Sequence, residues 1–346
     1  MAESLRFRNV KVSATERQHV APVSALAVVG MRMFSAGTDG RILGHERLPK
    51  GPFGFAGPEM RTTAPIVDMH AIRGKEVSRM LLAAACQDAD IRFWDVEREA
   101  SSEGMNAVLA EQAAHKLSGH SGPVSSVELL KTFCLSASLD GTARLWDLNV
   151  QKQIVSLGHQ DGVVKALSFP GTTELATQGL DDLMRMWDVR IAVDKPVAVL
   201  EAYLGRQVSA CAVNALGHLA VANDYGQTHI YDIRNVGVTR ALSNFQAPAG
   251  AKDDFPPITT MQFVLAGRYL ACAQANGTIL VFHPDSRETK VFTVQPASSK
   301  RPITVLHAAP WHKKTLLAYA GHGQHSWDFG MLEDIRDREA ALEESL

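Results

Sequence analysis

Cysteine, net charge and long apolar runs are all scarce in this sequence, and each scarcity excludes a class of protein. The chain has four cysteines in 346 residues and no C-x-x-C pair, so a disulfide framework is not expected. Its formal net charge is −2 and its pI is near 6.7, so no global field favours nucleic acid or an anionic membrane. No apolar run approaches the length that a bilayer-spanning helix needs.

Targeting signals are scarce as well. The N-terminal segment MAESLRFRNV lacks the apolar core of a signal peptide, and its early Glu3 is wrong for a mitochondrial presequence. The cysteines lie in apolar stretches such as LLAAAC and YLACA, which predicts buried, reduced thiols. With 46% apolar and 21% charged residues, we expect a soluble globular protein of the cytoplasm or nucleus with a large core.

Repetition is the feature that the sequence has in abundance. A short apolar pair, usually led by proline, recurs seven times with an average period of about 45 residues. Such a period is typical of arrays in which one repeat cannot bury its own apolar face. The pairs are Pro22-Val23, Pro65-Ile66, Pro123-Val124, Gly162-Val163, Gln207-Val208, Pro257-Ile258 and Pro302-Ile303.

Within a repeat, the pattern is that of short β-strands. In the third repeat, PVSSVELL (123–130) and TARLWD (142–147) alternate between apolar and polar residues, and FCLSAS (133–138) is a short apolar run. The Asp140-Gly141 pair between the last two segments is a strong hairpin signal. The same order of three strands recurs in residues 163–188, 208–232 and 258–283.

A fourth strand is expected in the segment that joins each repeat to the next, as in residues 151–158 and 195–203. Seven repeats of four antiparallel strands predict an all-β fold, a seven-bladed β-propeller. The last repeat has no fourth strand after Trp327-Asp328, while residues 4–12 are left over at the front. We expect this N-terminal strand to complete the last blade and close the ring, because closure removes an exposed sheet edge.

Insertions and a tail interrupt the repeats. Residues 48–64 are rich in Pro and Gly and predict a loop, as do residues 246–257. Residues 97–114 are rich in Glu and Ala and predict either a short helix or a flexible excursion. Residues 331–346 are acidic with a thin leucine stripe, which predicts a C-terminal helix outside a propeller domain at 1–330. This helix either packs on the propeller or serves as a segment that binds a partner.

Repeats three and four carry a specific resemblance. LSGH (117–120) with LWD (145–147), and LGH (157–159) with MWD (186–188), resemble the WD-repeat family, whose propellers usually have seven blades. In that family a hydrogen-bond relay links His, Ser or Thr, Asp and Trp inside a blade. The resemblance implies such a structural relay at His120, Ser136, Asp140 and Trp146, and again at His159, Thr177, Asp181 and Trp187.

The other repeats depart from this pattern. Repeat two keeps Asp88 and Trp94 but lacks the Gly-His pair and has Ala84 at the hydroxyl position. Repeats one, five and six lack both the Trp and the Gly-His pair, although Tyr231 stands where Trp would. Repeat seven keeps Trp327-Asp328 but has glycine at its turn position. Seven blades are therefore predicted, with six as the alternative.

No catalytic, cofactor or metal site is predicted, and we do not expect an enzyme. His120, Ser136 and Asp140 look like a hydrolase triad, but their recurrence in repeat four favours the structural relay. His322 and His325 are spaced like metal ligands, with His312 nearby, yet no Cys or HExxH accompanies them. No glycine-rich phosphate motif is present, so no nucleotide cofactor is expected.

The resemblance also implies where partners bind. In WD-repeat proteins they contact the narrow top face, through residues just before the turn Asp and near the start of each innermost strand. Apolar side chains from repeats two to four would gather there, and adjacent exposed apolar side chains usually mark a partner site. The alternative is that these loops fold inward and bury them. The implied contact residues are Val67, Gln87, Ser125, Leu139, Val164, Leu180 and Thr304, together with Thr38.

A second resemblance concerns the exits of two third strands. Trp187-Asp188-Val189-Arg190 and Tyr231-Asp232-Ile233-Arg234 resemble the W-D-x-R signature of propellers that act as substrate receptors of cullin-RING ubiquitin ligases. That resemblance implies that Arg190 and Arg234 lie on the bottom face and dock an adaptor. The alternative is an ordinary surface ion pair at a strand exit, which needs no partner.

The first expectation for function is a non-catalytic interaction scaffold that serves as one subunit of a multiprotein complex. The partners are other proteins, with no direct contact to nucleic acid or membrane. A ligase substrate receptor is the alternative. A hydrolase or metal-dependent enzyme on a propeller scaffold is a remote third reading, because fold alone does not determine function.

Overall fold

The structure is a computed structural model, and the part of the chain that it describes contains 28 β-strands and no helix. Within that part, no helix is therefore available to cross a membrane. The described residues are 5–10, 19–29, 32–47, 53–73, 79–97, 115–158, 161–191, 194–201, 207–234, 241, 243–246, 255–284, 289–292, 302–311, 314–321 and 328–334.

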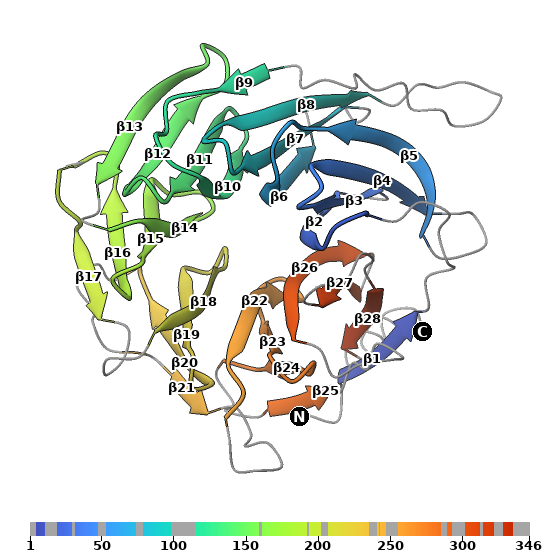
Figure 1. The fold of residues 1–346 in the computed structure, drawn as a ribbon. Coiled ribbons are helices and arrows are strands. Elements are labelled where there is room, and N and C mark those ends of the chain that lie inside the picture. Colours follow the sequence, from blue (N-terminus) through green and yellow to red (C-terminus); the bar gives the residue numbers. More distant parts are fainter. Residues whose placement is uncertain are drawn as a thin grey trace, which may run out of the picture.

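The strands form seven four-stranded antiparallel sheets arranged as the blades of a closed propeller (Figure 1). Blade 1 consists of β2 (Val23–Val29), β3 (Arg32–Gly37), β4 (Arg41–Arg47) and β5 (Phe53–Arg61). Blade 2 consists of β6 (Ile66–Arg73), β7 (Arg79–Cys86), β8 (Ile91–Glu97) and β9 (His115–Leu117). Blade 3 consists of β10 (Val124–Leu130), β11 (Phe133–Ser138), β12 (Thr142–Asp147) and β13 (Lys152–Gly158).

The remaining four blades follow in chain order. Blade 4 consists of β14 (Val163–Ser168), β15 (Glu174–Gly179), β16 (Leu183–Asp188) and β17 (Ala198–Glu201). Blade 5 consists of β18 (Val208–Val213), β19 (His218–Asn223), β20 (Gln227–Asp232) and β21 (Ser243–Gln246). Blade 6 consists of β22 (Ile258–Val264), β23 (Tyr269–Gln274), β24 (Ile279–Phe282) and β25 (Thr289–Phe292). Blade 7 consists of β26 (Ile303–Trp311), β27 (Lys314–Gly321), β28 (Asp328–Asp334) and β1 (Leu5–Val10).

Blade 7 confirms that the N-terminal strand closes the ring. β1 pairs antiparallel with β28, from Leu5 opposite Asp334 to Val10 opposite Phe329. The first strand of the chain thus supplies the outermost strand of the last blade, beside β28 (Figure 1). Because the closing strand comes from the opposite end of the chain, its backbone hydrogen bonds hold the ring together.

The apolar pairs found in the sequence begin the innermost strands. In all seven blades the second residue of the pair is the first residue of the innermost strand, and each of these residues is at most 4% exposed. Each strand also carries a register shift directly after that residue, as between Val124 and Ser126. The recurrence of this bulge shows that one backbone geometry is repeated around the ring.

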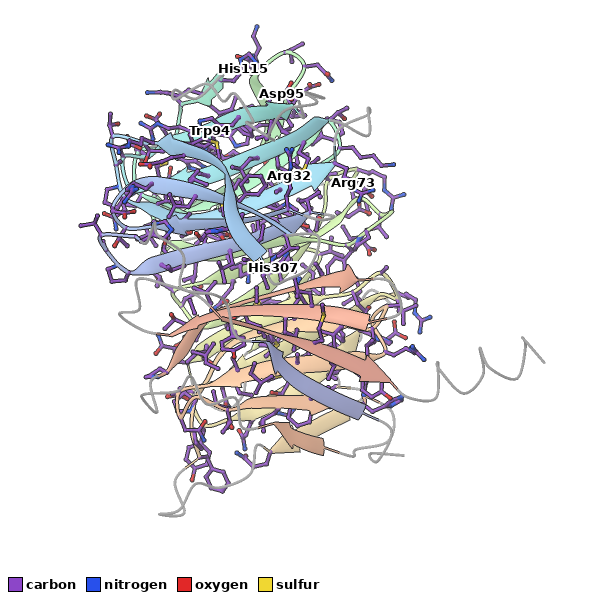
Figure 2. The ribbon with its side chains drawn as sticks, turned by 90° about the vertical axis from the view of Figure 1, so that its right-hand side faces the viewer. Arg32, Arg73, Trp94, Asp95, His115 and His307 are labelled. Atoms are coloured by element: carbon purple, nitrogen blue, oxygen red, sulfur yellow. The ribbon has the colours of Figure 1, made fainter. Side chains whose placement is uncertain are left out.

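The core is divided among the seven blade interfaces. Each of seven buried apolar clusters joins two neighbouring sheets; one, for example, contains Phe34 of blade 1 together with Trp94 of blade 2. Trp94, labelled in Figure 2, is buried in blade 2. No blade has a core of its own, as the repeat period predicts.

Two sequence-based expectations are corrected here. Residues 48–64 were expected to form a loop, but β5 occupies Phe53–Arg61. The register jumps from Leu43 opposite Glu59 to His45 opposite Phe55, so Ala56 to Pro58 form a bulge. An outermost strand has one unpaired edge, where proline and glycine are tolerated at a bulge.

The end of the propeller is the second correction. The third strand of blade 7 was expected to end near Trp327-Asp328, with a helix from residue 331. Instead β28 begins at Asp328 and runs to Asp334, so residues 331–334 belong to the propeller. Trp327 and residues 335–346 lie outside the described residues, as does most of the insertion 97–114.

Candidate functional site

Blade 3 brings its four predicted relay residues together. The Nδ1 atom of His120 lies 2.8 Å from Oδ2 of Asp140, and its Nε2 atom lies 2.8 Å from Oγ of Ser136. Trp146 donates its indole N–H to the same Oγ at 2.8 Å. If Nδ1–H of His120 donates to Asp140, the Ser136 hydroxyl donates to Nε2 and accepts from Trp146. Every polar atom of the relay then has a partner.

The electrostatics of the relay follow from burial and hydrogen bonding. Burial lowers the pKa of His120 despite the neighbouring carboxylate, so the imidazole is neutral at pH 7. Burial alone would raise the pKa of Asp140, but hydrogen bonds from Thr142, Ser121 and His120 outweigh it and lower the pKa to about 2. Ser136 is fully buried, which leaves its hydroxyl inaccessible to a substrate. His120, Ser136 and Asp140 therefore form an internal relay.

Blade 4 repeats part of this arrangement. Trp187 donates its indole N–H to Oγ1 of Thr177 at 2.7 Å, as Trp146 does to serine in blade 3. Asp181 forms an ion pair with Arg185, which is four residues further along the chain. His159 lies outside the described residues, so the histidine of the predicted relay has no structural account here.

Blade 1 contains a relay that the sequence reasoning missed. His19 lies 3.1 Å from Asp39 through Nδ1 and 2.9 Å from Ser35 through Nε2, and Ser35 lies 3.1 Å from Nε2 of His45. The separations of 16, 20 and 10 residues equal those of the blade 3 relay. That spacing was the available signal, although Gln18 replaces the glycine and His45 replaces the tryptophan.

Blade 2 keeps the tryptophan without its acceptor. Nε1 of Trp94 is buried and has no hydrogen-bond partner. Ala84, which precedes it by the same ten residues, stands where blade 3 has Ser136. The turn carboxylate Asp88 pairs instead with Arg92, whose Nη1 lies 2.8 Å from Oδ1. This blade is held by apolar packing and an ion pair at its top.

The top face, defined by the turns between second and third strands, carries two exposed leucines in contact with one glycine. Leu139 is 48% exposed and Leu180 is 53% exposed. A Cβ built on Gly162 would lie 2.9 Å from Cδ1 of Leu180 and 3.2 Å from Cα of Leu139, so the two leucines flank this glycine. The side chains of Leu139 and Leu180 are therefore exposed near one another on the tops of blades 3 and 4, and these two turns do not bury them.

Backbone hydrogen bonds hold the top-face turns in place. The amide N–H of Leu139 donates to Pro123 at 3.0 Å, and that of Leu180 donates to Gly162 at 2.8 Å. The exposed Gln87 and Thr38 occupy the same position in blades 2 and 1, with equivalent bonds to Pro65 and Pro22. The sequence-predicted residues of this row thus lie at equivalent sites on one face.

The predicted residues of the innermost strands lie at the mouth of the central channel. Val67, Ser125 and Val164 are half-buried and Thr304 is exposed, and all four line the channel. Ser125 also donates its hydroxyl to the carbonyl of Val163 at 2.6 Å, which joins blade 3 to blade 4. This residue has a structural contact in addition to the partner contact that the resemblance implies.

An aromatic pair on the top face was missed from the sequence. Tyr225 of blade 5 is 40% exposed, and its ring centroid lies 4.9 Å from that of Phe255, which precedes blade 6. Gln246 donates to the carbonyl of Tyr225 at 2.7 Å and anchors the turn. Tyr225 occupies the position of the turn Asp, where an aromatic residue has no role in the relay, and that substitution was the available signal.

The two W-D-x-R arginines have matching geometry on the bottom face. Arg190 donates its backbone N–H to Asp188 at 3.0 Å and its guanidinium lies 2.7 Å from the same carboxylate. Arg234 and Asp232 repeat the arrangement, with the backbone bond again 3.0 Å. Both arginine side chains are 67% exposed. Their guanidinium groups lower the pKa of Asp232 to about 2 and that of Asp188 further.

No cluster of three or more metal-ligating side chains occurs among the residues that the structure describes. His312, His322 and His325 lie outside those residues. All four cysteines are buried and free, and burial raises the pKa of each thiol, to about 11 at Cys86. These thiols are packing residues.

Comparisons with known proteins agree with a propeller of WD-type blades. A family model described as WD domain, G-beta repeat matches residues 111–147. An F-box/WD-40 repeat-containing protein of Arabidopsis thaliana is 28% identical over 168 residues, which cover 48% of this chain and 30% of the relative. A guanine nucleotide-binding protein subunit beta of Zea mays is 25% identical over 179 residues, which cover 48% of this chain and 46% of the relative. The matches thus span less than half the length of these relatives.

The fold also has a solved counterpart. The WD40 β-propeller domain of Doa1 superposes with a TM-score of 0.68 at 15% identity, covering 94% of this chain and 96% of that domain. The chain thus contains a WD-type repeat and has the fold of a WD40 β-propeller. WD-repeat propellers are generally non-catalytic, and the fold and the relatives support a protein-interaction scaffold in general.

Proposed function

We propose that this protein is a non-catalytic scaffold subunit of a multiprotein complex in the cytoplasm or nucleus, and that a partner docks on its top face. The observation that carries the proposal is the pair of exposed leucines, Leu139 and Leu180, in contact with one glycine. Adjacent exposed apolar side chains on a rigid frame are typical of an interaction site. Because the turns are already ordered by backbone bonds, binding costs little conformational entropy.

The test is quantitative affinity purification at native expression with the double variant Leu139→Asp/Leu180→Asp. Central apolar contacts in interfaces are worth about 1–2 kcal/mol each, so recovery of top-face partners should fall about tenfold or more. Leu216→Asp is the matched control, since Leu216 is 49% exposed in the β18–β19 turn on the opposite face. Equal partner recovery from the double variant and the control would contradict the proposal.

A substrate receptor of a cullin-RING ligase is the second candidate. The observation in its favour is that Arg190 and Arg234 repeat one geometry on neighbouring blades and keep their guanidinium groups exposed. Each guanidinium group is held by its own aspartate at the surface of the bottom face, where an adaptor could contact it. The structural alternative is a strand-exit ion pair with no partner.

The variant Arg190→Ala/Arg234→Ala separates the two explanations. If the arginines dock an adaptor, capture of the adaptor is lost while the circular-dichroism spectrum is unchanged. Lys152→Ala serves as control, because Lys152 is an exposed cation at the same end of blade 3. Adaptor capture at the unmodified level ends the ligase hypothesis.

A further inference from the structure

Side chains from all seven innermost strands line a central channel of about 410 Å³. Its wall carries polar as well as apolar side chains, whereas the clusters at the blade interfaces are apolar. His307 of β26 lies where blade 7 meets blade 1, with a hydrogen bond to the backbone of Val28 (Figure 2). The titratable side chains on the wall are Asp68, His70, Glu128, Lys165, Cys211 and His307.

Most of these groups join one blade to the next. Asp68 accepts the backbone N–H of Val127 at 3.1 Å, and Nδ1 of His70 accepts that of Leu129 at 2.9 Å. The inner edge of an innermost strand has no strand partner, so side chains of the preceding blade supply the missing acceptors. Asp68 and His70 are therefore explained by the connection of blade 2 to blade 3.

Glu128 does the same between blades 3 and 4. Its two carboxyl oxygens accept the N–H and the hydroxyl of Ser168 at 2.8 and 2.7 Å. Burial raises the pKa of Glu128 to about 7, against the opposing effect of these donors and of nearby Lys165. Gln262 connects blades 6 and 7 by accepting the N–H of Ala308 at 2.6 Å.

Blade 4 departs from the pattern at one register pair, Lys165 opposite Gln178. Gln178 is buried and donates to the carbonyl of Val208 at 2.9 Å, and it accepts the thiol of Cys211 at 3.3 Å. It therefore bridges blades 4 and 5. The other six blades have alanine at its position, namely Ala36, Ala85, Ala137, Ala222, Ala273 and Ala320.

Lys165 does not connect two blades by a hydrogen bond. Its charge lowers the pKa of nearby Glu128, but no described residue forms a hydrogen bond or an ion pair within 4 Å with its ammonium group. On the next strand of the channel wall, Oγ of Ser209 is buried without a hydrogen-bond partner. In blades 3 and 1 the equivalent hydroxyls donate to the neighbouring blade, as Ser24 does to Ile66 at 2.6 Å. Blades 4 and 5 thus place a lysine and a serine on the channel wall, and neither the ammonium group nor the buried hydroxyl has a hydrogen-bond acceptor among the described residues.

We propose that the channel binds a carboxylate between blades 4 and 5, held by the ammonium group of Lys165 and the hydroxyl of Ser209. The hydroxyl of Ser209 has three staggered χ1 positions, and the proposal requires one that faces the channel. A carboxylate suits the site better than a phosphate, because the acidic groups of Asp68 and Glu128 on the same wall repel a dianion more strongly. This site is separate from the proposed top-face docking of a protein.

Saturation-transfer NMR with butyrate, and with butyramide as its neutral isostere, tests the proposal. Butyrate should show transfer from the protein and butyramide little. Lys165→Met should reduce the butyrate signal to the butyramide level, and Ser209→Ala should weaken binding about threefold to tenfold. Lys131→Met, at an exposed lysine in the β10–β11 turn, is the matched control and should leave the signal unchanged.

Equal transfer to butyrate and butyramide would overturn the proposal, as would an undiminished butyrate signal in Lys165→Met. Lys165→Gln provides a second variant, and thermal unfolding checks that both variants fold. A peptide, acetyl-Leu-Glu-Leu-amide, identifies the source of the carboxylate. Peptide binding that depends on the glutamate and falls in Lys165→Met indicates a carboxylate carried by a protein. Binding of butyrate but not of the peptide indicates a free small acid.

Discussion

Blades 2 and 3 share one backbone frame and differ in the polar groups inside it. Both have a bulge directly after the first residue of the innermost strand. Both also have a buried tryptophan in the third strand, ten residues after Ala84 in blade 2 and after Ser136 in blade 3. Blade 3 surrounds Trp146 with Ser136 and His120, whereas Trp94 of blade 2 has no acceptor. Apolar packing between sheets is therefore sufficient to form a blade, and the relay adds stability to a fold that does not require it.

Blade 1 is an intermediate case. It keeps the histidine, the hydroxyl and the carboxylate but has His45 in place of the tryptophan. Burial lowers the pKa of His45 to about 3, an effect that nearby His19 reinforces. The same geometry thus depends on an imidazole that must stay neutral, which introduces a pH dependence that blade 3 lacks at this position.

Removing the hydroxyl of blade 3 is the change with the largest expected effect. Ser136→Ala leaves the Trp146 N–H and Nε2 of His120 buried without a partner. Blade 3 would then have two unpaired buried polar atoms at this place, where blade 2 has the Trp94 N–H. The free energy of unfolding should fall by about 2–4 kcal/mol, measured by urea denaturation. Ser121→Ala, at an exposed serine beside the relay, is the control and should change it little. A loss in Ser136→Ala no larger than in the control would show that the relay contributes nothing.

Acidification should weaken the relay of blade 1 at His45, a position where blade 3 has the non-titrating Trp146. The folded-state pKa of His45 is below its unfolded value of 6.5, so its contribution is present above pH 6.5 and is lost as pH falls. Between pH 7 and pH 5, His45 should account for about 1–2 kcal/mol of the loss in unfolding free energy.

The variant His45→Leu checks this assignment. Its absolute stability falls, because Ser35 loses a partner, but its stability should decline less between pH 7 and pH 5. His115→Leu serves as the control for replacing a histidine with leucine, since His115 is exposed in the structure. The same slope in His45→Leu and in the unmodified protein would contradict the assignment.

Completing blade 2 should have the smallest effect and the opposite sign. Ala84→Ser places a hydroxyl where Trp94 needs an acceptor, and the carbonyl of Arg92 can accept the hydroxyl proton as Arg144 does at 3.4 Å in blade 3. Unfolding free energy should rise by about 0.5–1 kcal/mol. Ala83→Ser, at a fully buried neighbour that faces the other side of the sheet, should destabilise the protein. Destabilisation by both changes would contradict this account.

The sequence predicted much of the frame, because the frame rests on local periodicity. All seven innermost strands begin at the residues that the apolar pairs indicate, and residues 151–158 and 195–203 contain the fourth strands β13 and β17. β5 was missed because a bulge in an outermost strand tolerates the Pro and Gly that usually mark a loop. The blade 7 boundary was wrong because a Trp-Asp pair was taken for the end of a strand that begins there.

The candidate sites were predicted less completely, since they depend on residues from different blades. The top-face row was named from the resemblance, but only the structure shows Leu139 and Leu180 meeting at Gly162. The His19 relay lacked the glycine and tryptophan that make the pattern visible. Nothing in the sequence marks Lys165 and Ser209, because the argument for them depends on the lack of hydrogen-bond partners among the described residues around them.

The order of residues by itself determined the number of repeats and most of their strands, and the resemblance that it carries implied the relay of blade 3, because each depends on spacing within about 45 residues. Tertiary structure decided which side chains are exposed, which polar atoms have partners and what lines the channel. Those properties arise where two sheets meet, and residues in neighbouring blades are too far apart along the chain for any local pattern to record their contact.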